Sequence, residues 1–142
     1  MKISVLQFPG TNCEYDTKYA FEQLGCDVEI IWHKEKNIPS DTDLLVIPGG
    51  FSYGDYLRSG AIARFANIME SVQTYAANGG KVLGICNGFQ ILLEAGLLPG
   101  AMKRNDSLHF ISKYHTLKVI NTDNEFLSLM KKDQVVNIPV AH

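Results

Sequence analysis

One cysteine, Cys86, lies in a sequence pattern that is typical of a catalytic nucleophile. Cys86 follows the apolar run 82–85 and lies between Gly84 and Gly88 in the segment GICNG. This spacing is that of the G-x-S-x-G nucleophile elbow, with sulfur in place of oxygen. Glycines at these two positions let a strand and a helix cross closely, because neither carries a Cβ atom that would clash. The pattern predicts a nucleophile on a strained strand-to-helix turn, exposed at the carboxyl edge of a sheet.

A cysteine at the start of a helix is suited to attack on an amide or another carbonyl compound. The partial positive charge of a helix N-terminus favours the thiolate over the thiol. The attack also needs N–H donors directed at the oxyanion that forms. We expect Gly49 and Gly50, at the end of a neighbouring strand, and the N–H of Asn87 to supply them. The structural alternatives are a small buried cysteine at position 86 and a plain tight turn at the two glycines.

The base that would activate this thiol is not identifiable. Cysteine catalysis normally uses a histidine that is oriented by an acid. Each histidine of the chain falls in a loop or a weak strand, outside any recognisable constellation: His33, His109, His115 and His142. We therefore expect these histidines to be solvated or structural.

Strands and helices alternate along most of the chain, which fixes where Cys86 would lie. Strands are predicted at 3–8, 28–32, 44–47 and 82–85. One helix is predicted to begin at a capping box of Thr11 and Glu14 and to end at Gly25. Two more are predicted over 62–76 and from Phe89 to Gly96. Parallel strands need crossover connections, so the alternation indicates a parallel sheet covered on both faces. We predict a flavodoxin-like, doubly wound α/β fold, with a loop at 51–60. Beyond Pro99, weak strands are predicted at 115–120 and 135–140, and a short helix at 125–130.

Composition and charge exclude several classes of protein. The chain has 142 residues, of which 46% are apolar and 20% charged, and its net charge is -2. These values are typical of one globular domain without a basic surface for nucleic acid or for a membrane. No apolar run is long enough to span a membrane, and a secretory signal pattern is absent. The three cysteines form no CxxC pair, so we expect free thiols, no metal site, a cytoplasmic location, and packing roles for Cys13 and Cys26.

Two long segments resemble a known family. They are PGGFSYGDYLRSGAIARF at 48–65 and GICNGFQILLEAGLLPG at 84–100, and the shorter segments QFPGTNCEYD at 7–16 and IPVAH at 138–142 agree with them. All four resemble glutaminase subunits of phosphoribosylformylglycinamidine synthases, which are class I (triad) glutamine amidotransferases of purine biosynthesis. The resemblance covers the whole chain and implies a class I glutamine amidotransferase-like fold.

The resemblance implies a role for each residue of the elbow. Cys86 would attack the carboxamide of glutamine, form a glutamyl thioester and release ammonia. Gly50 and Asn87 would form the oxyanion hole, while Gly49, Phe51 and Gln90 would bind the substrate; by itself, Gln90 would be interpreted as a helix-surface residue. The resemblance further implies a large synthetase subunit, which uses ATP and Mg²⁺ to convert formylglycinamide ribonucleotide to its amidine, and a small accessory subunit. We expect no cofactor in this chain itself.

The sequence departs from the family in one respect. Family members carry the catalytic His and Glu, spaced H-x-E, in a C-terminal segment that these residues do not include, and His142 matches a histidine of a different segment. We therefore expect a truncated form, a single incomplete domain over 1–142 with little or no glutaminase activity alone. Two alternatives remain: a DJ-1/PfpI-type cysteine hydrolase, against which Gln90 argues, and an inactive docking subunit. Asp55, Tyr56 and Arg58 are candidates for partner contact or for shaping the glutamine pocket.

Overall fold

The computed structural model describes residues 1–142, which fall into two compact units, Met1–Lys103 and Arg104–His142. The first unit alternates strands and helices along the chain as the sequence predicts. Its strands are β1 (Lys2–Gln7), β2 (Asp27–Trp32), β3 (Leu44–Ile47) and β4 (Lys81–Gly84), and its helices are α1 (Glu14–Gln23), α2 (Ile68–Ala77) and α3 (Asn87–Glu94). Two short 3-10 turns, η1 (Ser52–Asp55) and η2 (Ala63–Phe65), lie between β3 and α2.

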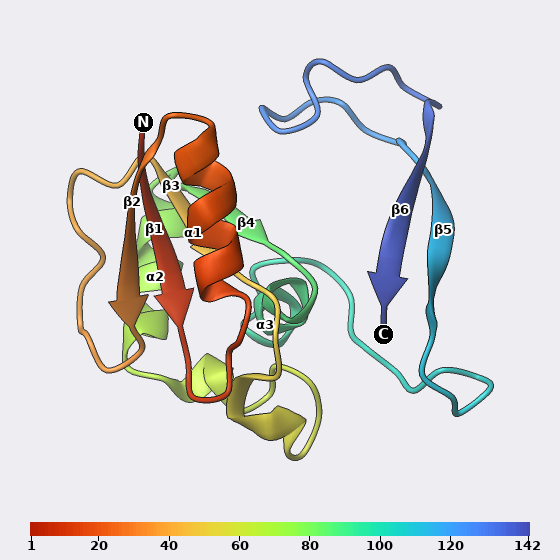
Figure 1. Ribbon diagram of the computed structural model, residues 1–142, viewed down its shortest axis with the longest axis horizontal. Helices are drawn as coiled ribbons and strands as arrows, with labels where there is room; N and C mark the ends of the chain where they lie inside the picture. The colour runs from red at the N-terminus through yellow and green to blue at the C-terminus, as the bar shows by residue number, and fades with distance from the viewer. The chain divides into compact units, whose positions relative to one another are not determined.

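The four strands form one parallel sheet in the order β2-β1-β3-β4. All strands therefore end at the same edge, where the loop after β1 lies beside the segment that follows β3 (Figure 1). The chain reverses its direction of winding between β1 and β3, and ligands of open α/β sheets bind at such a point. This order confirms the predicted doubly wound, flavodoxin-like fold.

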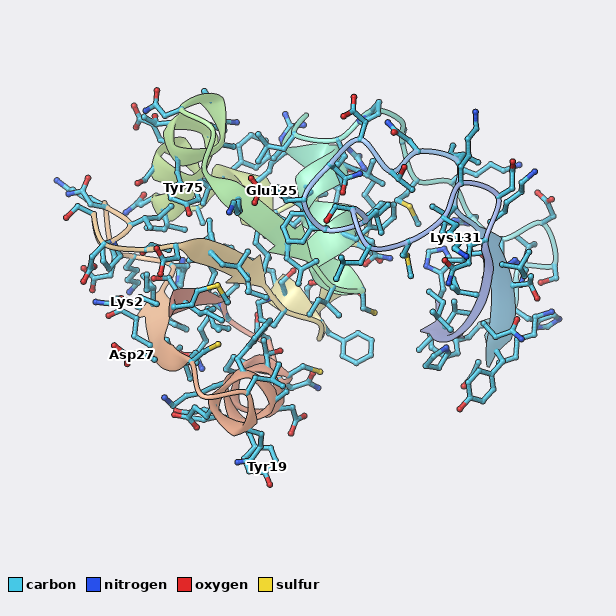
Figure 2. All side chains as sticks on the ribbon, turned by 90° about the horizontal axis from the view of Figure 1, so that it is seen from above. Lys2, Tyr19, Asp27, Tyr75, Glu125 and Lys131 are labelled. Atoms are coloured by element: carbon cyan, nitrogen blue, oxygen red, sulfur yellow. The ribbon has the colours of Figure 1, made fainter.

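Helices cover both faces of the sheet. Figure 2 shows α1, which carries Tyr19, on one side and α2, which carries Tyr75, on the other. On the α2 side, Leu45 and Ile47 pack with residues of α2 and α3 such as Val72 and Ile91. On the α1 side lies a second cluster built on Ile3, Val5, Val28, Leu44 and Val46. All four residues of β3 are buried, as expected for a central strand with both faces covered.

Helix α1 begins later than the sequence predicts, and without a capping box. Its N-cap is Cys13, which makes no side-chain cap hydrogen bond. Thr11 instead accepts a hydrogen bond at its Oγ1 from the N–H of Phe8, at 3.2 Å, and so closes the turn after β1. Glu14 is buried and accepts a 2.6 Å hydrogen bond from Gln7 Nε2. The predicted capping box is therefore wrong, because local side-chain hydrogen bonds in the turn compete with helix capping.

Helix α2 was predicted from residue 62 but begins at Ile68. The preceding residues form η2, and Ala66 is extended at ψ 148°. The backbone N–H of Ile68 then donates to the carbonyl oxygen of His33, at 3.3 Å. A 3-10 turn followed by a helix repeats apolar residues at nearly the same spacing as a single helix, and for that reason the pattern did not separate them.

The second unit, Arg104–His142, contains an antiparallel pair of strands, β5 (Ser112–Lys118) and β6 (Val135–Ala141). Both strands confirm the predictions in type, although β5 begins earlier than expected. The predicted helix at 125–130 is wrong, because these residues form turns. A six-residue segment rarely overcomes helix nucleation, and here Asn124 and Ser128 bond to the local backbone instead. A single domain over 1–142 stays a prediction.

The chain contains no helix that is both long and apolar enough to cross a membrane.

Candidate active site

Cys86 connects β4 to α3 in a strained backbone conformation. Its φ of 52° and ψ of −109° belong to a region that residues with a side chain rarely adopt. The residue is exposed, at the carboxyl edge of the sheet. The predicted strained turn is therefore confirmed, and the alternative of a small buried core cysteine is excluded by this exposure.

The two flanking glycines are required by close packing. A Cβ atom on Gly88 would lie 1.8 Å from the carbonyl oxygen of Ile47, and one on Gly84 would lie 2.8 Å from the carbonyl carbon of Gly88. Helix α3 thus packs directly on the end of β3 and crosses β4 without intervening side chains. This contact sets the direction in which the elbow presents the Cys86 side chain.

Gly49 and Gly50 lie beside the elbow, at the end of β3. A Cβ atom on Gly49 would meet the Cβ of Cys86 at 3.4 Å, so the absence of a side chain leaves space next to the thiol. Gly50 has a φ of +126°, and a Cβ there would lie 2.6 Å from the backbone nitrogen of Asn12. Gly50 also forms an isolated bridge with Thr11. The loop after β1 therefore fixes the backbone of Gly50.

Cys13 also lies in this region, which the sequence did not indicate. Its Sγ is 3.7 Å from the position that a Cβ on Gly49 would take. Burial raises the pKa of the Cys13 thiol, and the negative charges of Asp16, Cys86 and Glu14 raise it further. The available signal was positional: Cys13 follows the turn after a central strand, and such turns meet at the carboxyl edge of a parallel sheet.

The side chain of Asn87 joins the segment after Gly50 to helix α3. Asn87 is only 2% exposed, and its Oδ1 accepts a 3.2 Å hydrogen bond from the N–H of Ser52. Its Nδ2 donates to Asp55 Oδ1 at 3.2 Å and to Gln90 Oε1 at 3.0 Å. Gln90 is 9% exposed, so its interpretation as a helix-surface residue was wrong. Residues from the loop and from the first turn of α3 therefore share one buried hydrogen-bond network.

The far end of the same loop is held by an ion pair. Arg58 donates to Glu94 from Nε to Oε1 at 2.6 Å and from Nη2 to Oε2 at 2.7 Å, which is a bidentate geometry. Hydrogen bonding to Arg58 lowers the pKa of the Glu94 carboxyl. Gly60 packs on α3, where a Cβ would lie 2.8 Å from the nitrogen of Ile91. Burial raises the pKa of Asp55, although hydrogen bonds with Ser59 and Asn87 oppose the rise.

The loop carries three residues with side chains at positive φ. Tyr53, Asp55 and Leu57 have φ values of 53°, 55° and 73°. Each such residue costs about 1–3 kcal/mol and persists only where the surroundings hold it. Of the remaining loop candidates, Phe51 and Tyr56 are exposed, at 55% and 76%. The contacts with α3 therefore hold the loop in a conformation that it would not adopt alone.

The first unit contains one histidine, His33, which lies among aromatic side chains. His33 Nδ1 lies 3.0 Å from Tyr53 Oη, and its ring packs edge-on against Trp32, with centroids 4.4 Å apart. Burial lowers the pKa of His33. His109, His115 and His142 belong to the second unit. No group of three or more His, Cys, Asp or Glu side chains in the chain could hold a metal ion.

The site thus combines an exposed thiol with backbone N–H groups at the same sheet edge. As the first residue of α3, Asn87 has an N–H without a partner inside the helix. Gly50 follows Gly49, which lies beside Cys86 after the end of β3. A thiol close to such groups can attack a carbonyl carbon while N–H donors stabilise the oxyanion.

Comparisons with known proteins agree with this chemistry. The chain is 67% identical to the phosphoribosylformylglycinamidine synthase subunit PurQ of Sulfurimonas denitrificans and 60% identical to that of Wolinella succinogenes. Both matches include all 142 residues of this chain, but these are 63% and 65% of the two relatives. The chain therefore spans just under two thirds of the length of these curated relatives.

A solved structure and a family profile extend the comparison. The structure of PurLQS from Thermotoga maritima matches this chain with a TM-score of 0.91 and 41% sequence identity. The match covers 99% of this chain and 66% of the chain in that structure. Residues 1–142 match the profile described as the CobB/CobQ-like glutamine amidotransferase domain. This match extends over the whole chain, as the resemblance in the sequence did. The chain belongs to the family of CobB/CobQ-like glutamine amidotransferase domains.

Proposed function

We propose that this chain supplies the nucleophile of a glutaminase, as part of the glutaminase subunit of a phosphoribosylformylglycinamidine synthase. The observation that carries this proposal is the backbone of Cys86, held at φ 52° and ψ −109° between strand and helix with Gly49 beside it. The identity to subunits named PurQ supports the assignment to purine biosynthesis.

The proposed reaction is acyl transfer through the thiol. Cys86 Sγ attacks the carboxamide carbon of glutamine, and the resulting oxyanion accepts hydrogen bonds from the N–H groups of Gly50 and Asn87. The carbon–nitrogen bond then breaks, and ammonia leaves with the proton that the thiol gave up. A glutamyl thioester remains, which water hydrolyses to glutamate and free thiol.

We assign three further residues to the glutamine pocket. Gly49 leaves space beside the thiol, since a Cβ there would meet Cys86 at 3.4 Å. Phe51 is half exposed next to the oxyanion-hole glycine and can form a wall of the pocket. Gln90 is buried at the first turn of α3 and is oriented through Asn87. Glutamine selectivity would come from these residues rather than from the thiol itself.

The ammonia would pass to a large synthetase subunit, which would use ATP and Mg²⁺ to convert formylglycinamide ribonucleotide to its amidine. The similarity to the structure of PurLQS supports such an assembly, with a small accessory subunit as a further partner. Tyr56, at 76% exposure, is a loop residue that can contact a partner. We place this assembly in the cytoplasm, where its three free cysteines would stay reduced.

The similarity to glutamine amidotransferases favours this function over a DJ-1/PfpI-type cysteine hydrolase. An inactive docking subunit would have the same fold and partners but no substrate-dependent thiol. Protection of the thiol by substrate distinguishes these functions, because only a glutamine site brings L-glutamine to the sulfur.

The test is alkylation of Cys86 by iodoacetamide, with the modified peptides quantified by mass spectrometry. Saturating L-glutamine should slow the modification of Cys86, whereas D-glutamine and L-asparagine should not. Cys26, which packs against the α1-side core, serves as the internal control and should be modified at the same rate in all samples. Equal rates at Cys86 with and without L-glutamine would overturn the proposed function.

A further inference from the structure

The side chain of Asn87 forms hydrogen bonds both to the loop after Gly50 and to helix α3. An amide side chain offers two N–H donors and one carbonyl acceptor. Here both kinds of group are engaged: the oxygen with the N–H of Ser52, and the nitrogen with Asp55 and Gln90. The residue is 2% exposed, so water cannot replace these bonds at low cost. Three partners on two elements therefore depend on one residue.

We infer that Asn87 is a positioning residue for the oxyanion hole, acting through its side chain. The inference rests on the proposed function and goes beyond it, because there only the backbone N–H of Asn87 has a role. Ser52 is two residues from Gly50, so its bond to Asn87 Oδ1 fixes the chain that carries the other N–H donor. The Asn87 side chain thereby sets the separation between the N–H of Gly50 and its own.

The loop conformation explains why such a connector is needed. On the side of β1, Phe51 donates to the carbonyl oxygen of Gly10 and Tyr53 to that of Pro9. On the side of α3, the Arg58–Glu94 pair holds only the far end. The intervening Tyr53 and Asp55 have positive φ, a conformation that persists only where contacts hold it. Between those two attachments, Asn87 links the start of the loop to α3.

Reversing the donors and acceptors provides a specific test. Asn87→Asp keeps an acceptor for the N–H of Ser52 but replaces the donor that faces Asp55 with a carboxylate oxygen. Asp55→Asn then supplies a donor from the loop side, so the double variant N87D/D55N restores the link with its polarity reversed. A residue that mattered only for packing would not be rescued in this way.

Two measurements follow the loop and the site separately, on the full 142-residue chain. Hydrogen exchange of the peptide that contains Ser52 reports how firmly the loop is held. The rate at which 6-diazo-5-oxo-L-norleucine labels Cys86, divided by the iodoacetamide rate, reports the glutamine-specific site, since iodoacetamide carries no glutamine moiety. Asn78→Ala is the matched control, because Asn78 is exposed at the end of α2.

We expect Asn87→Ala to speed exchange at Ser52 and to lower the rate ratio, each by about tenfold, as the loss of a buried hydrogen bond predicts. N87D should do the same, N87D/D55N should recover most of both, and N78A should change neither. If Asn87→Ala does not fold, Asp55→Ala removes the contact from the loop side and should act in the same direction. Unchanged exchange and ratio in the folded variants, or a double variant no better than N87D, would overturn the inference.

Failure of the proposed function gives a different result. If the unmodified chain is not labelled by the glutamine analogue at all, the proposed glutaminase site is wrong. The exchange data still decide whether Asn87 holds the loop. Exchange at Ser52 that is as slow in N87A as in the unmodified chain would show that it does not. If the unmodified chain is labelled and the variants behave like it, the function stands and the inference fails.

Discussion

At the scale of single residues, the account depends on the space around one sulfur atom. Cys86 is exposed and strained, and a Cβ on Gly49 would lie 3.4 Å from the Cβ of Cys86 and 3.7 Å from the Sγ of Cys13. The nucleophile and its flanking glycines were predictable, because the spacing GICNG has a direct steric reason. The proximity of Cys13 was not predictable, since it depends on how the loop after β1 packs against β3.

Gly49→Ala should impair the site more than the fold. The new Cβ would lie 3.4 Å from the Cβ of Cys86, in van der Waals contact, and would fill space next to the thiol. We expect a folded protein whose labelling by 6-diazo-5-oxo-L-norleucine is reduced about tenfold or more, because the added methyl group displaces the reagent and a small misplacement of a reacting group is costly. Gly79→Ala is the control, because a Cβ there meets nothing within 4 Å, and the strain from its φ of +84° acts on the turn after α2 rather than on the site. Equal labelling of the two variants would contradict the assigned place of Gly49.

Cys13 should be alkylated slowly at neutral pH. Burial raises the pKa of its thiol, and the nearby negative charges of Asp16, Cys86 and Glu14 act in the same direction. Because the thiolate is the reactive form, the iodoacetamide rate at Cys13 should still be rising at pH values where an ordinary cysteine has reached its plateau. Mass spectrometry across pH 7 to pH 10, roughly spanning the ordinary thiol pKa, measures this. A plateau at or below the ordinary pKa would be the contrary result.

At the scale of elements, close crossing of β3, β4 and α3 builds the elbow. The strands were predictable because β3 is four apolar residues long and ends at Pro48-Gly49-Gly50. The start of α2 and the turn at 125–130 were not, because short apolar segments fit a helix, a 3-10 turn and an irregular turn equally well. Similarly, Thr11 and Glu14 match a capping box in spacing, but both side chains accept other hydrogen bonds, from Phe8 and Gln7 at the end of β1.

Gly88→Ala should unfold or severely destabilise the first unit. Its Cβ would lie 1.8 Å from the carbonyl oxygen of Ile47, and backbone on both sides prevents easy relief. We expect a loss of at least about 3 kcal/mol in the free energy of unfolding, as for severe overpacking. Gly25→Ala provides the comparison, because it has positive φ but open space, and should cost only about 1–2 kcal/mol. Urea denaturation measures both, and equal losses would argue against the close crossing.

Asp55 should make stability depend on pH. Burial raises the pKa of Asp55 in the folded state. Protonated Asp55 therefore contributes stability that is fully present at pH values below the unfolded-state pKa. This contribution is lost as the pH rises through the folded-state pKa. Asp55→Asn cannot ionise. The Tm of D55N relative to the unmodified chain should therefore increase as pH is raised from about 3.5 to about 7, across the carboxyl range. A difference that stays constant over this range would contradict the raised pKa.

At the scale of the whole chain, the two units differ in how much apolar surface they bury. The sheet and helices of Met1–Lys103 enclose two buried clusters. In Arg104–His142, every side chain of β5 is exposed, and a two-stranded sheet is at best marginally stable by itself. The alternation of strands and helices made the first unit predictable from sequence. The second had only short apolar runs, so its elements were predicted less completely.

Limited proteolysis should reveal this difference. We expect trypsin to cut first within Arg104–His142, where strands and turns are exposed, and to leave a resistant fragment that ends near Lys103. Intact mass spectrometry over time would identify the fragment. First cuts within β1 to α3 would contradict the division in stability.

The central claim is that Cys86 is the nucleophile of a glutamine site, and labelling by 6-diazo-5-oxo-L-norleucine tests it most directly. The reagent places an electrophilic carbon where the carboxamide of glutamine would lie, and mass spectrometry of peptides identifies the cysteine that forms the adduct. The account predicts an adduct at Cys86 that is suppressed by L-glutamine and absent in Cys86→Ser, with Cys13 and Cys26 unmodified. Labelling spread over the three cysteines, or an adduct at Cys86 that L-glutamine does not suppress, would contradict it.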